Sequence, residues 1–484
     1  MIGPIEGDME FHVRLTGRGD LAAQIYRQLR EAVFDGRLRP GERLPPTREL
    51  AERLGVARNT VAAAYDRLTA EGFLVGRVGS GTYVGDRRLI GEARPRTAPV
   101  GQGVRPRPVW DSVPEVPRRP APRYDFRVGA PDPALFPLQT WRRLVGRQLR
   151  AATVRCPAYT EPDGHPGLRA ALARHLGVSR SVRAGADDVL VTQGAQQALD
   201  LVGRVLIEPG DRVAVEEPGY PPVRRLFQTL GARVTGVPVD AEGLVVAALP
   251  ADSRLVYVTP SHQFPLGVPM SPARRTALLD WAERRGAVVV EDDYDSEYRF
   301  AGRPLEPLQG LDRRGRVVYV GSFSKTLLPM LRVGFLVAPA SLRPALRTAR
   351  QLTDWHGDLT TQGALAEFVD EGLLARHVRR TSREYAARRR LILAALAAHL
   401  AGRLHPVPSA AGLHLATRPA PGTNGDLDAV AARAREAGVA VESLAGYCGE
   451  HPGQAGLVIG YGGIAQPDIE EGIRRLAAAF GPGS

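Results

Sequence analysis

The stretch Gly321-Ser322-Phe323-Ser324-Lys325 holds the single lysine of this 484-residue sequence, in which lysine and arginine together number 64. An arginine-biased composition also leaves a lone lysine, so the surrounding residues decide its meaning. Arginine stays protonated, whereas a lysine amine can lose its proton and form a Schiff base. The hydroxyls of Ser322 and Ser324 can hold phosphate oxygens, and Arg332 adds a fixed positive charge further along. The stretch predicts a phosphate site beside a reactive amine.

Short apolar runs indicate that Lys325 follows one strand of a larger sheet. Such continuous runs are typical of strands buried on both faces of a mostly parallel sheet, and helical stretches separate them. We therefore expect an α/β domain whose ligands bind at the strand ends. The predicted strands cover residues 189–191, 212–215, 255–258, 287–290, 317–320 and 334–337.

Two further clusters follow predicted strands. Gly194, Ala195 and Gln196 form a strand-to-helix turn, where free backbone N–H groups and the helix dipole favour a phosphate. Tyr220 lies at the end of the next strand, where its ring can stack on a flat cofactor. A tyrosine that simply packs in the core is the alternative at this position.

A dense set of carboxylates ends the strand at 287–290, in Glu291-Asp292-Asp293-Tyr294-Asp295. Gathering acids in this way is costly unless they have partners. A metal site is the rival interpretation, and the lack of a histidine at ligand spacing argues against it. An aspartate that faces a pyridine nitrogen keeps that nitrogen protonated, which makes the ring an electron sink.

Together these clusters resemble fold-type I pyridoxal 5′-phosphate (PLP) enzymes of the aminotransferase class. The resemblance implies that Lys325 forms an aldimine with PLP, that Asp292 faces the pyridine nitrogen and Tyr294 the ring hydroxyl, and that Tyr220 stacks on the ring. It also implies a homodimer with shared sites, because Tyr159 matches a tyrosine that reaches the partner's phosphate. The implied phosphate ligands are Ser322, Ser324, Arg332, Gly194, Ala195 and Gln196.

The sequence departs from that family pattern at two positions. Phe264 stands where an asparagine usually binds the ring hydroxyl, so His262 or Gln263 is expected to substitute for it. Val458 stands where an arginine usually clamps a substrate carboxylate. Ordinary amino-acid transamination therefore needs another arginine.

The N-terminal residues predict a helix-turn-helix followed by a two-stranded wing. Helices are expected over 21–34, from Thr47 as N-cap to Leu54, and over 57–68, with a glycine turn between the last two. Strands over 73–75 and 81–84 then pair around a tip at 77–80. This stretch resembles the GntR family of regulators, which implies contacts to double-stranded operator DNA. The expected DNA-binding residues are Arg48, Arg58, Asn59, Thr60, Arg77 and Ser80.

Composition sets the domain plan. We expect a winged helix-turn-helix over residues 11–84, an extended linker rich in proline and arginine over 85–122, and the PLP-binding domain over 123–484. The alternative for 85–122 is a loop packed on the larger domain, with Trp110 as an anchor point. The net charge of +12 permits a polyanionic partner. No apolar run reaches membrane length, no signal peptide is recognisable, and Cys156 and Cys448 form no disulfide or zinc pattern, so we expect a cytoplasmic protein.

The combination of both modules is similar to the MocR subgroup of GntR regulators. It implies a multidomain transcriptional regulator that senses PLP as an aldimine at Lys325 and controls vitamin B6 synthesis, as the pyridoxine-regulating members do. Two alternatives stay open: a regulator that responds to a γ-amino acid or a taurine-like amine, and a working aminotransferase with a vestigial DNA module. We expect regulation rather than steady turnover.

Overall fold

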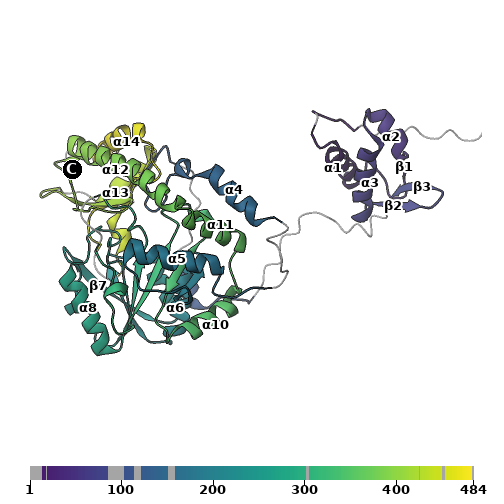
Figure 1. The fold of residues 1–484 in the computed structure, drawn as a ribbon. Helices are drawn as coiled ribbons and strands as arrows, with labels where there is room; N and C mark the ends of the chain where they lie inside the picture. Colours follow the sequence, from purple (N-terminus) through teal and green to yellow (C-terminus); the bar gives the residue numbers. More distant parts are fainter. Residues whose placement is uncertain are drawn as a thin grey trace, which may run out of the picture. The chain divides into compact units, whose positions relative to one another are not determined.

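The computed structural model describes residues 13–17, 19–85, 103–113, 122–150, 159–300, 305–423, 426–449 and 453–481. The chain divides into two compact units, residues 1–105 and 106–484. Each unit has its own hydrophobic core. Figure 1 shows the helices and strands of both units.

The N-terminal unit is a three-helix bundle with a small antiparallel sheet. Its core is built by apolar residues of all three helices and of the strands, including Ile25, Leu50 and Val61. The sheet order β1-β3-β2 makes β2 and β3 the predicted wing. The elements are α1 (Leu21–Phe34), β1 (Arg43–Leu44), α2 (Thr47–Leu54), α3 (Arg58–Ala70), β2 (Leu74–Arg77) and β3 (Gly81–Val84).

The second unit is built on an eight-stranded sheet of order β5-β12-β11-β10-β9-β6-β7-β8, within the part of the chain that the structure describes. Neighbouring strands from β11 to β7 pair in parallel, whereas β12 and β8 pair antiparallel with their neighbours. The strands are β5 (Val189–Thr192), β6 (Arg212–Glu217), β7 (Arg233–Asp240), β8 (Gly243–Leu244), β9 (Ser253–Val258), β10 (Val288–Asp293), β11 (Val317–Ser322) and β12 (Gly334–Val337).

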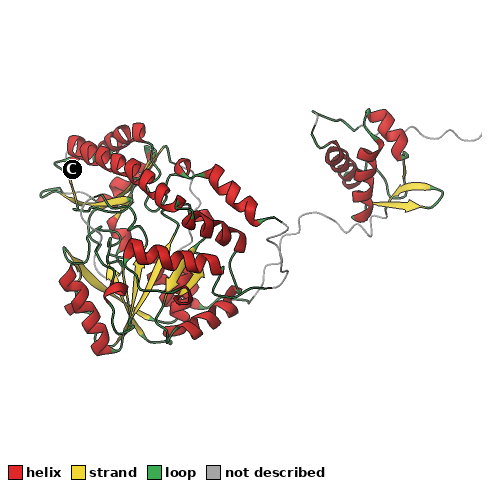
Figure 2. Ribbon diagram, in the orientation of Figure 1, coloured by secondary structure: helices red, strands yellow, loops and turns green. Residues whose placement is uncertain are grey.

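Helices cover both faces of this sheet (Figure 2). Alternate strand residues face opposite sides: Leu190 packs with α6, α7 and α10, whereas Val191 packs with α4, α5 and α11. Further along, α8 packs on the face that carries Val256. These helices are α4 (Leu138–Gln148), α5 (Pro166–Arg180), α6 (Ala195–Leu206), α7 (Pro221–Thr229), α8 (Pro272–Arg285), α9 (Leu308–Leu311), α10 (Arg343–Asp354) and α11 (Leu359–Asp370).

The C-terminal part of this unit forms a second layer around a four-stranded sheet of order β13-β14-β17-β16. Its core contains residues of three helices together with Tyr124 and Phe126, which lie far away in the sequence. The elements are α12 (Leu373–Leu400), β13 (Leu404–Pro406), β14 (His414–Pro419), α13 (Leu427–Glu436), β16 (Glu442–Ser443), β17 (Leu457–Gly460), α14 (Gln466–Ala478) and the parallel pair β4 (Tyr124–Asp125) and β15 (Val439–Ala440).

The fold class predicted from the sequence is confirmed, and so are all six predicted strands. The third predicted helix begins at Arg58. Thr47 is the first helical residue of α2 instead of its N-cap, which is Pro46, and the Thr47 hydroxyl accepts a hydrogen bond from Arg58 Nε at 3.4 Å. Residues 86–102 and 114–121 of the predicted linker lie outside the described residues.

One described linker segment packs against the second unit instead of extending freely. It forms a short 3₁₀ helix over Pro108–Ser112, and Arg107 Nη2 donates to the carbonyl oxygen of Thr229 at 3.2 Å. Cys448 is a free thiol, whereas Cys156 lies outside the described residues. Within the described ranges, every helix is too short or too polar to cross a membrane.

Candidate functional site

A cavity of about 1170 Å³ opens at the ends of β10 and β11. It lies between the large sheet and the C-terminal layer, because its walls come from both. Most of the residues singled out in the sequence gather here: Gln196, Ala195, Tyr220, Asp292, Tyr294, Ser322, Ser324, Lys325 and Arg332 line it.

Lys325 points into this cavity directly after β11. Its Nζ donates a hydrogen bond of 2.6 Å to the carbonyl oxygen of Gly129. Burial lowers the pKa of Lys325, while the charges of Asp295, Asp292 and Glu442 act in the opposite direction. The charged groups that act on the amine are therefore acids, and burial outweighs them.

Asp292 is the buried acid opposite the amine. Tyr257 donates its hydroxyl to Asp292 Oδ2 at 2.8 Å, whereas Oδ1 has no hydrogen-bond partner among the described residues. Burial raises the pKa of Asp292 to about 7, and the charge of Asp293 adds to this effect. A buried carboxylate oxygen without a partner is costly. It therefore fits a ligand that brings a proton or a positive charge to Oδ1.

The predicted phosphate cradle is assembled around Gly194, which precedes α6. Gly194 has φ of +82°, and a Cβ there would lie 2.9 Å from Arg332 Nη2. Arg332 Nη2 in turn donates to the carbonyl oxygen of Gln193 at 2.6 Å. Ser322 Oγ donates to Ser324 Oγ at 2.9 Å, which holds both hydroxyls on the same wall. Only glycine lets the guanidinium approach the start of α6 this closely.

Aromatic rings form another part of the wall. Tyr220 meets Phe264 edge to face at 5.5 Å between ring centroids, and Phe264 meets Tyr294 in the same way at 5.7 Å. Burial raises the pKa of Tyr220 to about 12 and that of Tyr294 well above its ordinary value. Both tyrosines therefore keep their protons at neutral pH and can serve as hydrogen-bond donors.

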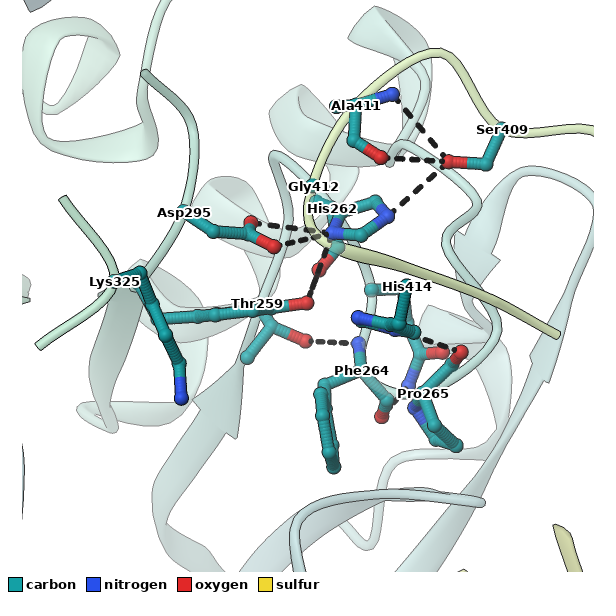
Figure 3. A network of polar contacts seen from close by, with 12 residues as sticks. Thr259, His262, Phe264, Pro265, Asp295, Lys325, Ser409, Ala411, Gly412 and His414 are labelled. Atoms are coloured by element: carbon teal, nitrogen blue, oxygen red, sulfur yellow. Dashed lines mark hydrogen bonds and ion pairs between the residues drawn. The ribbon is translucent and has the colours of Figure 1, made fainter. Parts of the chain in front are cut away.

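His262 and Gln263, the two residues proposed from the sequence for the ring hydroxyl, are not among the residues that line the cavity, and His262 contacts Tyr294 instead. Its Nδ1 lies 2.9 Å from the Tyr294 hydroxyl and 3.0 Å from Asp295 Oδ2, and its Nε2 lies 3.1 Å from Ser409 Oγ. Figure 3 shows this network beside Lys325. His262 thus positions Tyr294. Gln263 is turned away as well, since its amide donates to the carbonyl oxygen of Pro218 at 2.9 Å.

Although no histidine lies at ligand spacing in the sequence, the fold brings two histidines next to Asp295. His262, Asp295 and His414 each offer one ligand atom, and these atoms lie within 4.8 Å of one another. His414 Nε2 lies 3.1 Å from the carbonyl oxygen of Pro265, its partner in Figure 3. Hydrogen bonding within the protein therefore accounts for this cluster. The cluster draws on three segments that are far apart in the sequence, so no short sequence motif predicts it.

Glu442 and Arg127 are among the wall residues that the sequence did not indicate. Glu442 lines the cavity, and the register of β16 with β17 places it opposite Val458. Arg127 also lines the cavity, and its Nε and Nη2 donate to the carboxylate of Asp125 at 2.8 and 2.6 Å. Val458 itself is buried and apolar.

In the N-terminal unit the predicted DNA-binding residues lie on α2, on α3 and at the wing, and all of them except Thr60 are exposed. Arg58 and Asn59 are on the first turn of α3, followed by the half-buried Thr60. Arg48 is exposed on α2 and pairs with Glu52 at 3.3 Å. At the wing, the Arg77 guanidinium lies 4.8 Å from the centroid of the Tyr83 ring, and Ser80 is exposed at the tip.

Comparisons with known proteins assign both units. The model of the bacterial regulatory proteins of the gntR family matches residues 21–84, and that of aminotransferase class I and II matches residues 126–447. The probable rhizopine catabolism regulatory protein MocR of Rhizobium meliloti is 40% identical over 94% of this chain and 93% of its own length. The chain belongs to the MocR-type GntR regulators.

Two other similar proteins are a transcriptional regulator, similar over most of this MocR-type chain, and a solved aminotransferase, similar over about three quarters of it. The pyridoxine biosynthesis transcriptional regulator PdxR of Corynebacterium glutamicum is 35% identical over 91% of the chain and 92% of its own length. The solved kynurenine aminotransferase of Pyrococcus horikoshii is 29% identical with a TM-score of 0.68, over 73% of this chain and 90% of that structure. The MocR-type chain is thus a transcriptional regulator with an aminotransferase-like domain.

Membership of the aminotransferase class I and II family indicates pyridoxal 5′-phosphate as the cofactor of the MocR-type domain. Two observations indicate that the residues of this cavity can hold pyridoxal 5′-phosphate. Asp292 Oδ1 has no partner in the described structure, and Gly194 leaves open the space that a Cβ would fill beside Arg332. Tyr159 is not brought to this cavity: it is 76% exposed, and its ring lies 4.9 Å from that of Trp355. Its contact with a partner's phosphate remains a prediction.

Proposed function

We propose that this regulator changes its affinity for operator DNA when PLP occupies the cavity at Lys325, and that it controls vitamin B6 synthesis. The observation that carries the proposal is the buried Lys325 amine in a cavity that also contains Asp292, Tyr220 and Arg332. The similarity to PdxR, whose name assigns it to pyridoxine biosynthesis, supports the choice of PLP as the signal.

Each wall residue has a role that follows from its chemistry. Bound PLP supplies an aldehyde that combines with primary amines and a ring that withdraws electrons. Lys325 provides the amine, and its burial favours the neutral form that can react. Asp292 would hold a proton at the pyridine nitrogen through its free Oδ1.

The remaining wall residues would fix the orientation of the cofactor. Tyr220 would lie against the ring face, and Tyr294, positioned by His262, would face the ring hydroxyl. The phosphate would be held by the hydroxyls of Ser322 and Ser324, by the amides of Gly194, Ala195 and Gln196, and by Arg332.

On the DNA side, we assign base contacts to Arg58 and Asn59, since both are exposed at the start of α3. Arg48, Thr60, Arg77 and Ser80 would contact phosphates, with Arg77 also able to enter the minor groove. A homodimer would present two such surfaces, which matches an operator with two half-sites.

A second candidate function, an amine-responsive regulator, is favoured by the size of the cavity. Its volume of about 1170 Å³ exceeds the roughly 300–1,000 Å³ that one drug-sized ligand needs. Part of the wall, including Arg127, Glu442 and Tyr447, has no role in the cofactor assignment. This leaves room for a small amine beside PLP.

A titration of the purified protein with PLP separates these functions. Absorbance would report binding, and retention of the DNA upstream of its own gene would report regulation. A PLP-sensing regulator changes its DNA affinity with PLP alone, and Lys325→Ala abolishes that response. An affinity for operator DNA that changes neither on addition of PLP nor in Lys325→Ala would rule out PLP sensing. A parallel assay with an amino donor and a keto acid tests the aminotransferase alternative, which steady turnover alone would support.

A further inference from the structure

Glu442 is a carboxylate in the cavity wall that the cofactor assignment does not use. It lies on β16, and its side chain is half-buried. The backbone N–H of Val128 donates to its Oε1 at 2.9 Å, and the Tyr447 hydroxyl donates to its Oε2. Each carboxylate oxygen accepts more than one hydrogen bond, so both keep capacity for a ligand.

Backbone contacts connect Glu442 to the reactive amine. Val128, which holds Glu442, is followed by Gly129, whose carbonyl oxygen accepts the hydrogen bond from Lys325 Nζ at 2.6 Å. The charge of Glu442 also raises the pKa of Lys325 against the larger effect of burial. A group attached close to a ligand amine at Lys325 would therefore meet this carboxylate.

Two residues next to Glu442, Val458 and Arg127, offer no free cation to an acidic ligand, although the exposed Arg225 and Arg435 line the same cavity. Val458 lies opposite Glu442 in the register of the two strands, and it is apolar. The Arg127 guanidinium is held by Asp125 through two hydrogen bonds of 2.8 and 2.6 Å. A ligand carboxylate would meet a like charge here, whereas a hydroxyl or ammonium group would gain a charge-assisted hydrogen bond.

We infer that the second ligand of this cavity is a small primary amine with a hydroxyl or a second ammonium group on the neighbouring carbon, and that Glu442 binds this group. The inference rests on the proposed function, because it needs PLP at Lys325. It makes Glu442 the residue that selects amino alcohols and diamines over amino acids.

A series of compounds that differ only in one substituent tests the inference. PLP-loaded full-length protein is titrated with 2-aminoethanol, 1,2-diaminoethane, ethylamine and β-alanine, and both the absorbance of bound PLP and the affinity for upstream DNA are followed. The first two should bind about tenfold more tightly than ethylamine, as expected for one charge-assisted hydrogen bond, and β-alanine should bind most weakly.

Two substitutions show whether Glu442 is responsible. Glu442→Gln keeps an acceptor for Val128 and removes the charge, so 1,2-diaminoethane should lose about tenfold in affinity and β-alanine should gain. Asp428→Asn removes an exposed acid that also lines the cavity, and it should leave the order of the four compounds unchanged.

Three outcomes would overturn the inference: tighter binding of β-alanine than of 1,2-diaminoethane, no response to any of the amines, or an unchanged order in Glu442→Gln. The exposed Arg225 and Arg435, which also line the cavity, would then be the groups that bind an acidic ligand. Failure of the protein to take up PLP appears before any amine is added and would remove the proposed function as well.

Discussion

Lys325 is the only lysine of the sequence, and its amine donates a hydrogen bond to a backbone carbonyl oxygen at the cavity wall. Lys325→Arg keeps the positive charge and loses the nucleophile, so we expect no yellow Schiff-base absorbance with PLP. Borohydride reduction followed by peptide mass spectrometry checks this, because in the wild-type chain a pyridoxyl group on a lysine side chain has only residue 325 as its site. Absorbance that persists in Lys325→Arg would disprove the assignment.

Asp292 makes stability depend on pH in a defined direction. Burial raises its pKa from an unfolded value of about 3.9 to about 7, so the folded protein binds the extra proton between these values. Stability of the cofactor-free protein should therefore fall as pH rises from about 4 to about 7. Asp292→Asn should flatten this dependence by up to about 1.4 kcal/mol per pH unit.

Urea denaturation of wild type and Asp292→Asn at several pH values measures that difference. Glu291 and Glu297, whose pKa values burial also raises to about 7, contribute to both proteins and cancel in the comparison. The pKa of Glu216 is raised by burial and in part by the charge of Asp292, so its contribution belongs to the measured difference. Parallel pH profiles would show that the Asp292 carboxyl is already ionised in the folded protein.

The sequence indicated the cavity residues that lie at or just beyond the end of a strand, such as Asp292 at the end of β10 and Lys325 three residues after β11. Strand ends of one parallel sheet meet at one edge, so chain order alone places them together. His262 and Glu442 could not be assigned in this way. Their roles depend on partners from distant segments: Asp295 and Ser409 for His262, and Val128 and Tyr447 for Glu442.

Among the elements, the continuous apolar runs were recognised because their strands are buried on both faces. The missed strand β7 has alternating exposed and buried residues and includes Gly236 and Pro238, which disfavour strands. β16 has only two residues and depends on pairing with β17, so its sequence carries no periodic signal.

The turn into α6 supports a test of the cradle. Gly194→Ala adds a Cβ 2.9 Å from Arg332 Nη2 at a positive φ, so it should displace the guanidinium and weaken PLP binding about tenfold or more. Gly286→Ala is a matched control, since Gly286 has φ of +65° and a Cβ added there would meet no atom within 4 Å. It should reduce the melting temperature without changing PLP affinity. Equal PLP affinity in both variants would contradict the assignment of Gly194 and Arg332 to the phosphate site.

The exposed start of α3 predicts how operator binding responds to substitution. Arg58→Ala should weaken binding by about 1–3 kcal/mol if the side chain reads a base, and it should relax sequence preference at that base. Arg48→Ala should weaken binding to all sequences and reduce the salt dependence, as expected for a phosphate contact. Binding isotherms on operator and scrambled DNA at two salt concentrations distinguish these effects. Arg53→Ala, on α2 and paired with Glu49, serves as the control.

At the scale of the whole molecule, Tyr159 tests whether two chains share one site. Its side chain is 76% exposed and does not line the cavity of its own chain, so a single-chain site gains nothing from its hydroxyl. If the hydroxyl binds the phosphate in the partner's cavity, Tyr159→Phe should weaken PLP binding about tenfold through the loss of one charge-assisted hydrogen bond.

Mixed dimers make this prediction specific. A chain with Tyr159→Phe retains Lys325, and a chain with Lys325→Ala retains Tyr159, so their dimer contains one complete site. Co-expression with two affinity tags isolates that dimer, and PLP titration should then find one tight site, with wild-type affinity, per two chains. Each variant alone should have none. Tight binding by Tyr159→Phe alone would mean that the hydroxyl of residue 159 does not bind the phosphate of either chain's PLP.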